Sequence, residues 1–173
     1  TPNQRVEIGS IEKMSKSKKN VVDPDDIIGT YGADTARWFM LSDSPPERDV
    51  QWTQEGVDGA WRFVQRVWRL IDAQAENLTD ISPARAQADD LSGAALELHR
   101  IVHRSIHEVT QDLEALGFNR AVARIYNLAN ELSGFAPADD DARAVLKSGL
   151  LTLVQLFAPM MPHLAESCWH TLG

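Results

Sequence analysis

The sequence has little cysteine, no long apolar run and few lysines. Cys168 is the only cysteine among 173 residues, which excludes an internal disulfide and a multi-cysteine zinc site. The best apolar stretch, residues 150–161, falls short of the roughly 18 residues that cross a bilayer. It is also interrupted by Thr152, Gln155 and Pro159. These absences predict a cytoplasmic protein with no membrane span.

Positive charge is scarce and unevenly placed. The chain carries 17 Lys+Arg against 25 Asp+Glu, a formal net charge of -8, which argues against a general polyanion binder. Four of its five lysines lie within residues 13–19, and the fifth is Lys147. Ammonium groups are mobile point charges and serines favour turns, so this window predicts a polyphosphate-binding loop. The alternative is an ordinary solvated basic loop.

The beginning of the chain predicts a short mixed segment. Residues 5–12 indicate a strand or hairpin that follows Thr1 almost at once, so we expect the chain to be a piece of a longer protein. Asp23 and Pro24 predict a helix start, because aspartate is a good N-cap and proline fits the first turn. A second helix is expected over residues 33–41.

From residue 53 onward the pattern is helical. Apolar residues recur at three- and four-residue steps, the period of an amphipathic helix. Long helices are expected to begin at Thr53, near Asp89, at Asn119 and at the acidic run 139–141, with a short one after Pro162. The predicted fold is mainly α: a helical bundle over 53–173, preceded by a small strand, loop and helix segment over 1–52.

The lysine window has a specific spelling. Residues 13–17 read KMSKS, the second signature of class I aminoacyl-tRNA synthetases, and the chain resembles that family. NVVDP at 20–24, YGADTAR at 31–37 and FAPMMPHLAE at 157–166 resemble, in order, sequences of the subgroup that handles leucine, isoleucine and valine. PPERDVQW at 45–52 and the Lys18-Lys19-Asn20 sequence after the signature most resemble bacterial leucyl-tRNA synthetases.

The resemblance implies a division of labour. Residues 1–52 would be the end of a catalytic domain with its KMSKS loop and connector, and residues 53–173 an anticodon-binding helical bundle. The parent enzyme would use ATP, with Mg²⁺, to activate leucine as leucyl-adenylate and transfer it to tRNA(Leu). By resemblance Lys16 is the chief catalytic contact to ATP and Lys13 assists, and the ATP loop comprises Lys13, Met14, Ser15, Lys16 and Ser17.

The piece is expected to be inactive alone and monomeric. The family's first signature, HIGH, is absent from the sequence. The leucine pocket and the editing site would lie elsewhere in the parent. His99, His103 and His107 have helical spacing but no evident acidic or cysteine partner, so no metal site is expected.

Rows of arginine are candidate tRNA contacts. The planar guanidinium group suits phosphate, and four- and three-residue spacing places each row on one helix face. The candidates are Arg62, Arg66, Arg69, Arg100, Arg104, Arg120 and Arg124. The alternative for each is an ordinary solvated or salt-bridged surface.

Two other functions remain open from the sequence. One is a sibling specificity, a valyl- or isoleucyl-type synthetase, because the amino-acid pocket lies outside these residues. The other is a non-catalytic helical module that binds RNA or protein and retains the loop as a vestige.

Overall fold

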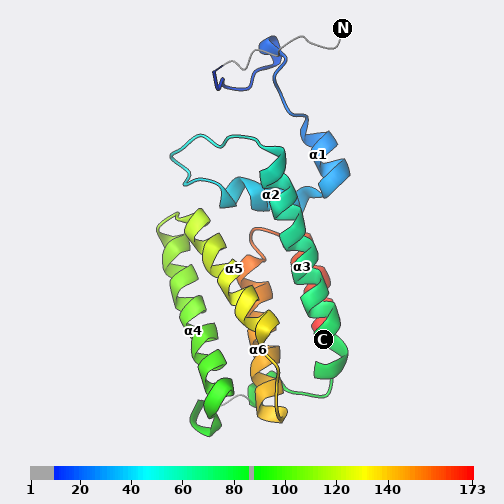
Figure 1. The fold of residues 1–173 in the computed structure, drawn as a ribbon, viewed down its shortest axis with the longest axis vertical. Coiled ribbons are helices and arrows are strands. Elements are labelled where there is room, and N and C mark those ends of the chain that lie inside the picture. The colour runs from blue at the N-terminus through cyan, green and yellow to red at the C-terminus, as the bar shows by residue number, and fades with distance from the viewer. Residues whose placement is uncertain (1–9, 86–87) are drawn as a thin grey trace, which may run out of the picture.

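A computed structural model describes residues 10–85 and 88–173 and shows seven α-helices in those ranges (Figure 1). They are α1 Pro24–Tyr31, α2 Ala33–Ser42, α3 Gln54–Leu78, α4 Gly93–Glu114, α5 Phe118–Gly134, α6 Asp140–Phe157 and α7 Pro162–Leu172. The described ranges contain no strand. The strand or hairpin expected over residues 5–12 lies mainly outside the described residues, and its described part, residues 10–12, is not a strand. The mainly α fold class is confirmed for the part of the chain that the structure describes.

Three of the expected helix starts are confirmed by their caps. The Asp23 carboxylate accepts the Asp25 N–H at 3.0 Å, and the Thr53 hydroxyl accepts the Gly56 N–H at 3.2 Å. Asp139 accepts the Ala142 N–H at 2.8 Å. Each cap satisfies one backbone donor that has no partner within its helix.

The expected starts of α4 and α5 are wrong by a few residues. Residues 88–90 form a short 3-10 turn, and α4 begins only at Gly93. Asn119 is not a cap, because α5 begins at Phe118. The reason is a tight reversal in which Leu116 adopts a left-handed φ of 54° and the Gly117 N–H reaches the Asp112 carbonyl at 2.7 Å.

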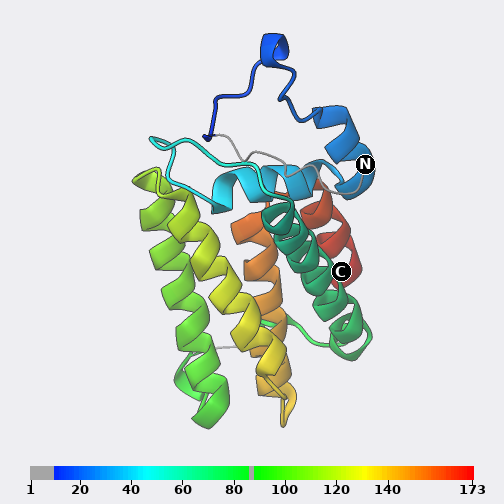
Figure 2. The ribbon, with the colours of Figure 1, turned by 45° about the horizontal axis from the view of Figure 1, so that its top comes forward.

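Helix α6 is the centre of the bundle. Eleven of its 18 residues are buried, more than in any other described helix. Figures 1 and 2 show α4 and α5 on one side of α6, with α3 and α7 on the other. A methyl group at Gly149 would lie 2.5 Å from Leu132 Cδ2, so α5 approaches α6 closely because this position lacks a side chain.

Helix α2 crosses one end of the bundle and clasps the turn between α6 and α7. Asp34 is buried, and its Oδ2 accepts the Leu164 N–H at 2.7 Å while Oδ1 accepts from His163 Nδ1–H at 2.9 Å. Three residues further on, Arg37 donates to the Pro159 and Met160 carbonyls, both at 2.9 Å. We call these four hydrogen bonds the α2 clasp.

The clasp supplies a cap that α7 lacks in its own sequence. The residue before the helix, Met161, has no side chain that can accept a hydrogen bond from the first turn. Asp34 takes that role from a different helix and adds negative charge at the positive end of the α7 dipole. Arg37 then satisfies carbonyls of the turn that have left the α6 hydrogen-bond ladder.

An aromatic cluster adds α2 to the hydrophobic core. Trp38 is fully buried and stacks on Phe63 of α3, with ring centroids 4.9 Å apart and planes 11° apart. Its indole Nε1–H donates to the Tyr126 hydroxyl of α5 at 3.2 Å. Trp38 therefore packs where the first segment meets the bundle.

Two cations of α6 close the far end of α3. Lys147 is buried and donates to the Leu78 carbonyl at 3.1 Å, while Arg143 Nε donates to the Asn77 carbonyl at 3.1 Å. These carbonyls end α3, where helix geometry leaves acceptors unused and the dipole favours positive charge. The one lysine outside the 13–19 window is thus a structural cap.

Asp112 ties α4 to α5. It is buried, and its two oxygens accept from Arg120 Nε at 2.9 Å and Arg124 Nε at 2.6 Å. Glu108 accepts from Arg124 Nη1 at 2.6 Å. Burial alone would raise the pKa of Asp112, but hydrogen bonds and charge from Arg124 and Arg120 outweigh it and hold the pKa below its ordinary value.

The clasp predicts the effect of Asp34→Ala. We expect the free energy of unfolding to fall by about 2–3 kcal/mol, because a charged cap and a buried hydrogen bond are lost together. Denaturant unfolding followed by circular dichroism measures this. Asp72→Ala is the control, since Asp72 is exposed on α3 and forms no ion pair within the described residues. A loss no larger than that of the control would contradict the role of Asp34.

The lowered pKa of Asp112 predicts a pH dependence. Its stabilising effect is fully present above the pKa of the unfolded state, about 3.9, and disappears as the pH falls through the lower folded value. Asp112→Asn should therefore cost about 2 kcal/mol at pH 7. The difference in free energy of unfolding between Asp112→Asn and wild type, measured by denaturant unfolding at each pH, should narrow only below about pH 4. If that difference widens on acidification, the ion pairs of Asp112 with Arg120 and Arg124 do not stabilise the fold as described.

Candidate functional site

The lysine loop, residues 13–19, is a closed turn. Ser15 begins a 3-10 turn, Lys16–Lys18, and its Oγ accepts the Lys18 N–H at 3.3 Å. Asn20 closes the loop from the other end: its Oδ1 accepts the Ser15 N–H at 2.8 Å and its Nδ2 donates to the Lys13 carbonyl at 3.4 Å. The backbone is thus held by side chains of its own segment.

The four lysines of the loop differ in how their charge is used. Lys18 forms an ion pair with Glu12 at 2.7 Å. Lys13, Lys16 and Lys19 are exposed, and none of them forms an ion pair with a described residue. Lys13 and Lys16, the two lysines expected to contact ATP, are therefore free to bind an anion, whereas the charge of Lys18 is neutralised by Glu12.

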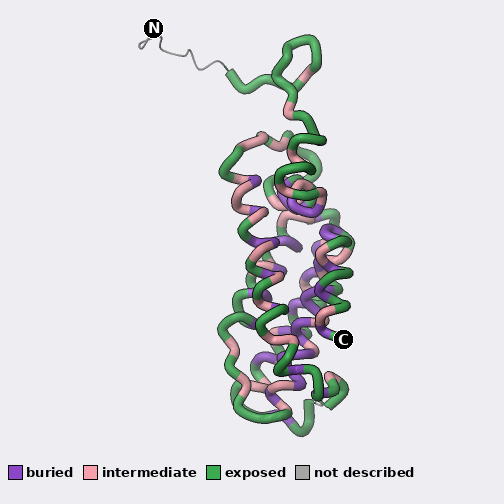
Figure 3. Tube along the Cα trace, turned by 90° about the vertical axis from the view of Figure 1, so that its right-hand side faces the viewer, coloured by how far each residue is buried: buried purple, intermediate pink, exposed green. Residues whose placement is uncertain are grey.

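The loop stands away from the bundle. Figure 3 shows this end of the chain largely exposed, with buried residues concentrated along the bundle interior. A cavity of about 520 Å³ lies between the loop on one side and α2 with the connector, residues 43–52, on the other. Lys13 and Met14 line it on the loop side, and Met40, Val50 and Trp52 on the other. Its wall is partly apolar and partly charged, as a site for a mixed ligand requires.

Helix α1 connects the loop to the bundle through one tyrosine. The Tyr31 hydroxyl donates to Asp58 Oδ1 on α3 at 2.9 Å and accepts from Gln54 Nε2 at 2.5 Å. Its ring meets Trp61 edge-on, with centroids 6.2 Å apart. The hydrogen bond to Asp58 raises the pKa of Tyr31, so the phenol keeps its proton and the link persists at neutral pH.

The structure separates the seven candidate arginines into three groups. Arg120 and Arg124 are occupied by Asp112 and Glu108. Arg100 and Arg104 share Glu97, at 3.8 and 3.9 Å. The α3 row of Arg62, Arg66 and Arg69 is exposed, and none of the three forms an ion pair within residues 10–85 and 88–173.

The histidine pair on α4 and the single cysteine are the other groups with reactive or ligating chemistry. His99 and His103 lie side by side with ring centroids 4.4 Å apart, and burial together with His103 lowers the pKa of His99. The described ranges hold no cluster of three His, Cys, Asp or Glu side chains suited to a metal. Cys168 is buried, and burial raises its pKa to about 12. No helix in those ranges is long and apolar enough to cross a membrane.

Sequence reasoning missed the residues that organise the site. Asn20 closes the loop, and an asparagine beside a Ser- and Lys-rich turn is a known signal for such bonding. The YGADTAR motif contains Asp34 but gives no sign that this residue caps α7. The partners of Asp34 and Tyr126 lie more than 80 residues away in the sequence, so no local pattern could identify them.

Two family models match different parts of the chain. "Anticodon-binding domain of tRNA ligase" matches residues 96–173, and "tRNA synthetases class I (I, L, M and V)" matches residues 7–53. The second match contains the lysine loop, α1 and α2, and the first contains most of α4 and all of α5, α6 and α7.

Curated relatives cover nearly the whole chain. The leucine–tRNA ligase of Parvibaculum lavamentivorans is 56% identical over 166 residues, which are 96% of this chain and 19% of that protein. The leucine–tRNA ligase of Bartonella bacilliformis is 55% identical over 177 aligned residues, which cover 100% of this chain and 20% of that protein. The chain spans about a fifth of the length of these relatives.

Solved structures share the fold. LeuRS of Agrobacterium radiobacter K84, in a ternary complex with tRNA and LeuAMS, matches with a TM-score of 0.85 and 31% identity, covering 93% of this chain and 21% of that chain. Methionyl-tRNA synthetase of Mycobacterium tuberculosis matches with a TM-score of 0.62 and 20% identity, covering 85% of this chain and 34% of that chain, a likeness of fold alone. By its similarity to these ligases over nearly its whole length, the chain belongs to the leucine–tRNA ligase family and corresponds to about one fifth of such a protein.

Proposed function

We propose that this chain supplies the KMSKS loop and the tRNA-docking bundle of an enzyme that joins leucine to tRNA(Leu). The observation that carries the proposal is the pair of uncommitted lysines, Lys13 and Lys16, on a turn closed by Asn20. The relatives that match the chain at 55–56% identity are leucine–tRNA ligases, which favours leucine over valine or isoleucine. Residues 1–52 are the end of the catalytic domain, and 53–173 the bundle.

In this proposal the loop acts on the phosphates of ATP during leucine activation. The leucine carboxylate attacks the α-phosphate, leucyl-adenylate forms and pyrophosphate leaves. Negative charge grows on the oxygen that departs with pyrophosphate. Lys16 and Lys13 stabilise that charge, and they raise the rate because they bind the transition state more tightly than bound ATP. Met14, Ser15 and Ser17 complete the loop and hold the lysines in position.

Mg²⁺ belongs to ATP in this account. Described residues offer no cluster of acidic or histidine ligands, and Mg²⁺ is commonly bound through substrate phosphates with few protein ligands. No Mg²⁺ ligand is therefore assigned to this chain, and none of its residues acts through the ion.

The bundle is the proposed docking surface for tRNA(Leu). Support comes from the family model over residues 96–173 and from the LeuRS relative, whose structure contains tRNA. Exposed arginine rows on α3 and α4 are the candidate cations for the phosphate backbone. We further propose that the parent enzyme works as a monomer in the cytoplasm and that its leucine pocket and editing site lie outside these residues.

The loop predicts the effect of Lys16→Ala in the full-length enzyme. Leucine-dependent pyrophosphate exchange should fall by about 10²- to 10³-fold, while leucine binding changes little, because one transition-state contact is lost. Lys18→Ala is the matched control in the same loop, since Lys18 is paired with Glu12 in an exposed ion pair of small energy. Equal losses in the two variants, or unchanged exchange in Lys16→Ala, would remove Lys16 from its assigned role.

If the leucine pocket and the HIGH signature lie elsewhere in the parent enzyme, this chain alone should be inactive. Purified residues 1–173 should show no pyrophosphate exchange and no hydrolysis of mischarged tRNA, because HIGH is absent from the sequence and no leucine pocket is assigned to it. The assay is run at enzyme concentrations that give a strong signal with the full-length protein. Activity that co-purifies with the chain and is lowered by Lys16→Ala would contradict the proposal that essential parts of the active site lie outside these residues.

A further inference from the structure

The proposed function leaves open which face of the bundle meets the RNA. The chain carries a net charge of -8, so only a locally positive surface attracts a phosphate backbone. The seven candidate arginines compete for that role, and the charges around them distinguish one group from the others.

Two of the three arginine groups already pair with carboxylates of the protein, and this makes them less suited to bind phosphate. Arg120 and Arg124 already satisfy Asp112, a buried carboxylate that would be left unpaired if they turned toward a ligand. Arg100 and Arg104 share one exposed Glu97. Of the three candidate groups, only the α3 row forms no ion pair within the described residues.

One member of that row is held in position by an aromatic ring. The Arg66 guanidinium carbon lies 5.4 Å from the centroid of the Phe63 ring. Phe63 is fixed in turn, because it stacks on Trp38 and meets Tyr126 at a centroid distance of 3.9 Å. Arginine over an aromatic face loses less conformational freedom when it binds an anion, since its plane is already oriented.

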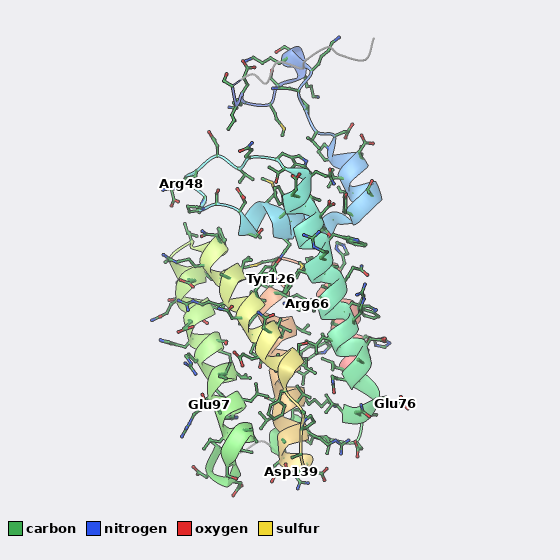
Figure 4. The ribbon with its side chains drawn as sticks, in the orientation of Figure 1. Arg48, Arg66, Glu76, Glu97, Tyr126 and Asp139 are labelled. Atoms are coloured by element: carbon green, nitrogen blue, oxygen red, sulfur yellow. The ribbon has the colours of Figure 1, made fainter. Side chains whose placement is uncertain are left out.

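Tyr126 adds a neutral donor beside these charges. Its hydroxyl oxygen accepts from Trp38, and its O–H donates to no residue in the described part of the chain. Burial raises the pKa of Tyr126, and the Trp38 hydrogen bond and the nearby Arg66 and Arg62 charges lower it only in part, so the phenol keeps its proton. Figure 4 shows Arg66 and Tyr126 between α3 and α5, with Glu97 away on α4.

We propose that Arg62, Arg66 and the Tyr126 hydroxyl form a phosphate-binding face between α3 and α5 that contacts the RNA backbone, with Arg69 extending it along α3. This inference rests on the proposed docking of tRNA and deepens it. From Arg62 to Arg69 the helix rises about 10 Å, the span of roughly three phosphates along one strand. Exposed Asp72 and Glu76 follow Arg69 and end the face.

The test compares two matched double variants of this chain. Arg62→Gln/Arg66→Gln removes two exposed charges at i, i+4 on α3, and Arg100→Gln/Arg104→Gln removes two exposed charges with the same spacing on α4. Binding of a fluorescent tRNA(Leu) transcript is measured by anisotropy from 50 to 200 mM salt. Unfolding of each variant by denaturant confirms that the bundle is intact.

The α3 variant is expected to bind about tenfold more weakly at 0.1 M salt, with a salt slope shallower by about 1.5 to 2, whereas the α4 variant stays within about threefold of wild type. An equal or larger loss in the α4 variant would overturn the α3–α5 face and leave tRNA docking intact. Absence of salt-dependent binding by the wild-type chain would overturn the docking proposal itself, and this inference with it.

Discussion

The Asp34 carboxylate is buried, and both of its oxygens are used at the first turn of α7, which has no cap of its own. Arg37, on the same helix, takes the carbonyls of the preceding turn. Opposite charges three residues apart therefore fix the two sides of one helix junction. Because Trp38 is next along α2 and stacks in the core, the position of α2 is determined by polar and apolar contacts together.

That constraint connects the two parts of the chain. The lysine loop makes contacts mainly within its own segment, and it reaches the bundle through α1, α2 and the connector. Tyr31 links the end of α1 to α3, and the α2 clasp links the next helix to α6 and α7. The aromatic cluster that stabilises α2 also supports Arg66 on the surface. The loop and the proposed RNA face are thus both connected to the bundle through α2 and the helices that it contacts.

Local features were predictable from the sequence, and partners distant in the chain were not. The caps at Asp23, Thr53 and Asp139 are hydrogen bonds to backbone groups two or three residues away, so residue type alone predicts them. The position of the loop follows from its KMSKS motif. Asn119 was a reasonable cap, but the left-handed residue at Leu116 starts α5 earlier. Spacing also placed arginines in rows without showing which carboxylates face them, because that depends on how each helix is rotated in the bundle.

We infer that the α2 clasp makes α2 and the bundle one cooperative unit. Native-state hydrogen exchange of the purified chain can test this, because it reports the opening free energy of each helix. The most protected amides of α2 should open with the same free energy as those of α6 and α7, in a single global unfolding event. Exchange of α2 through a separate opening of much lower free energy, while α6 and α7 remain protected, would contradict it.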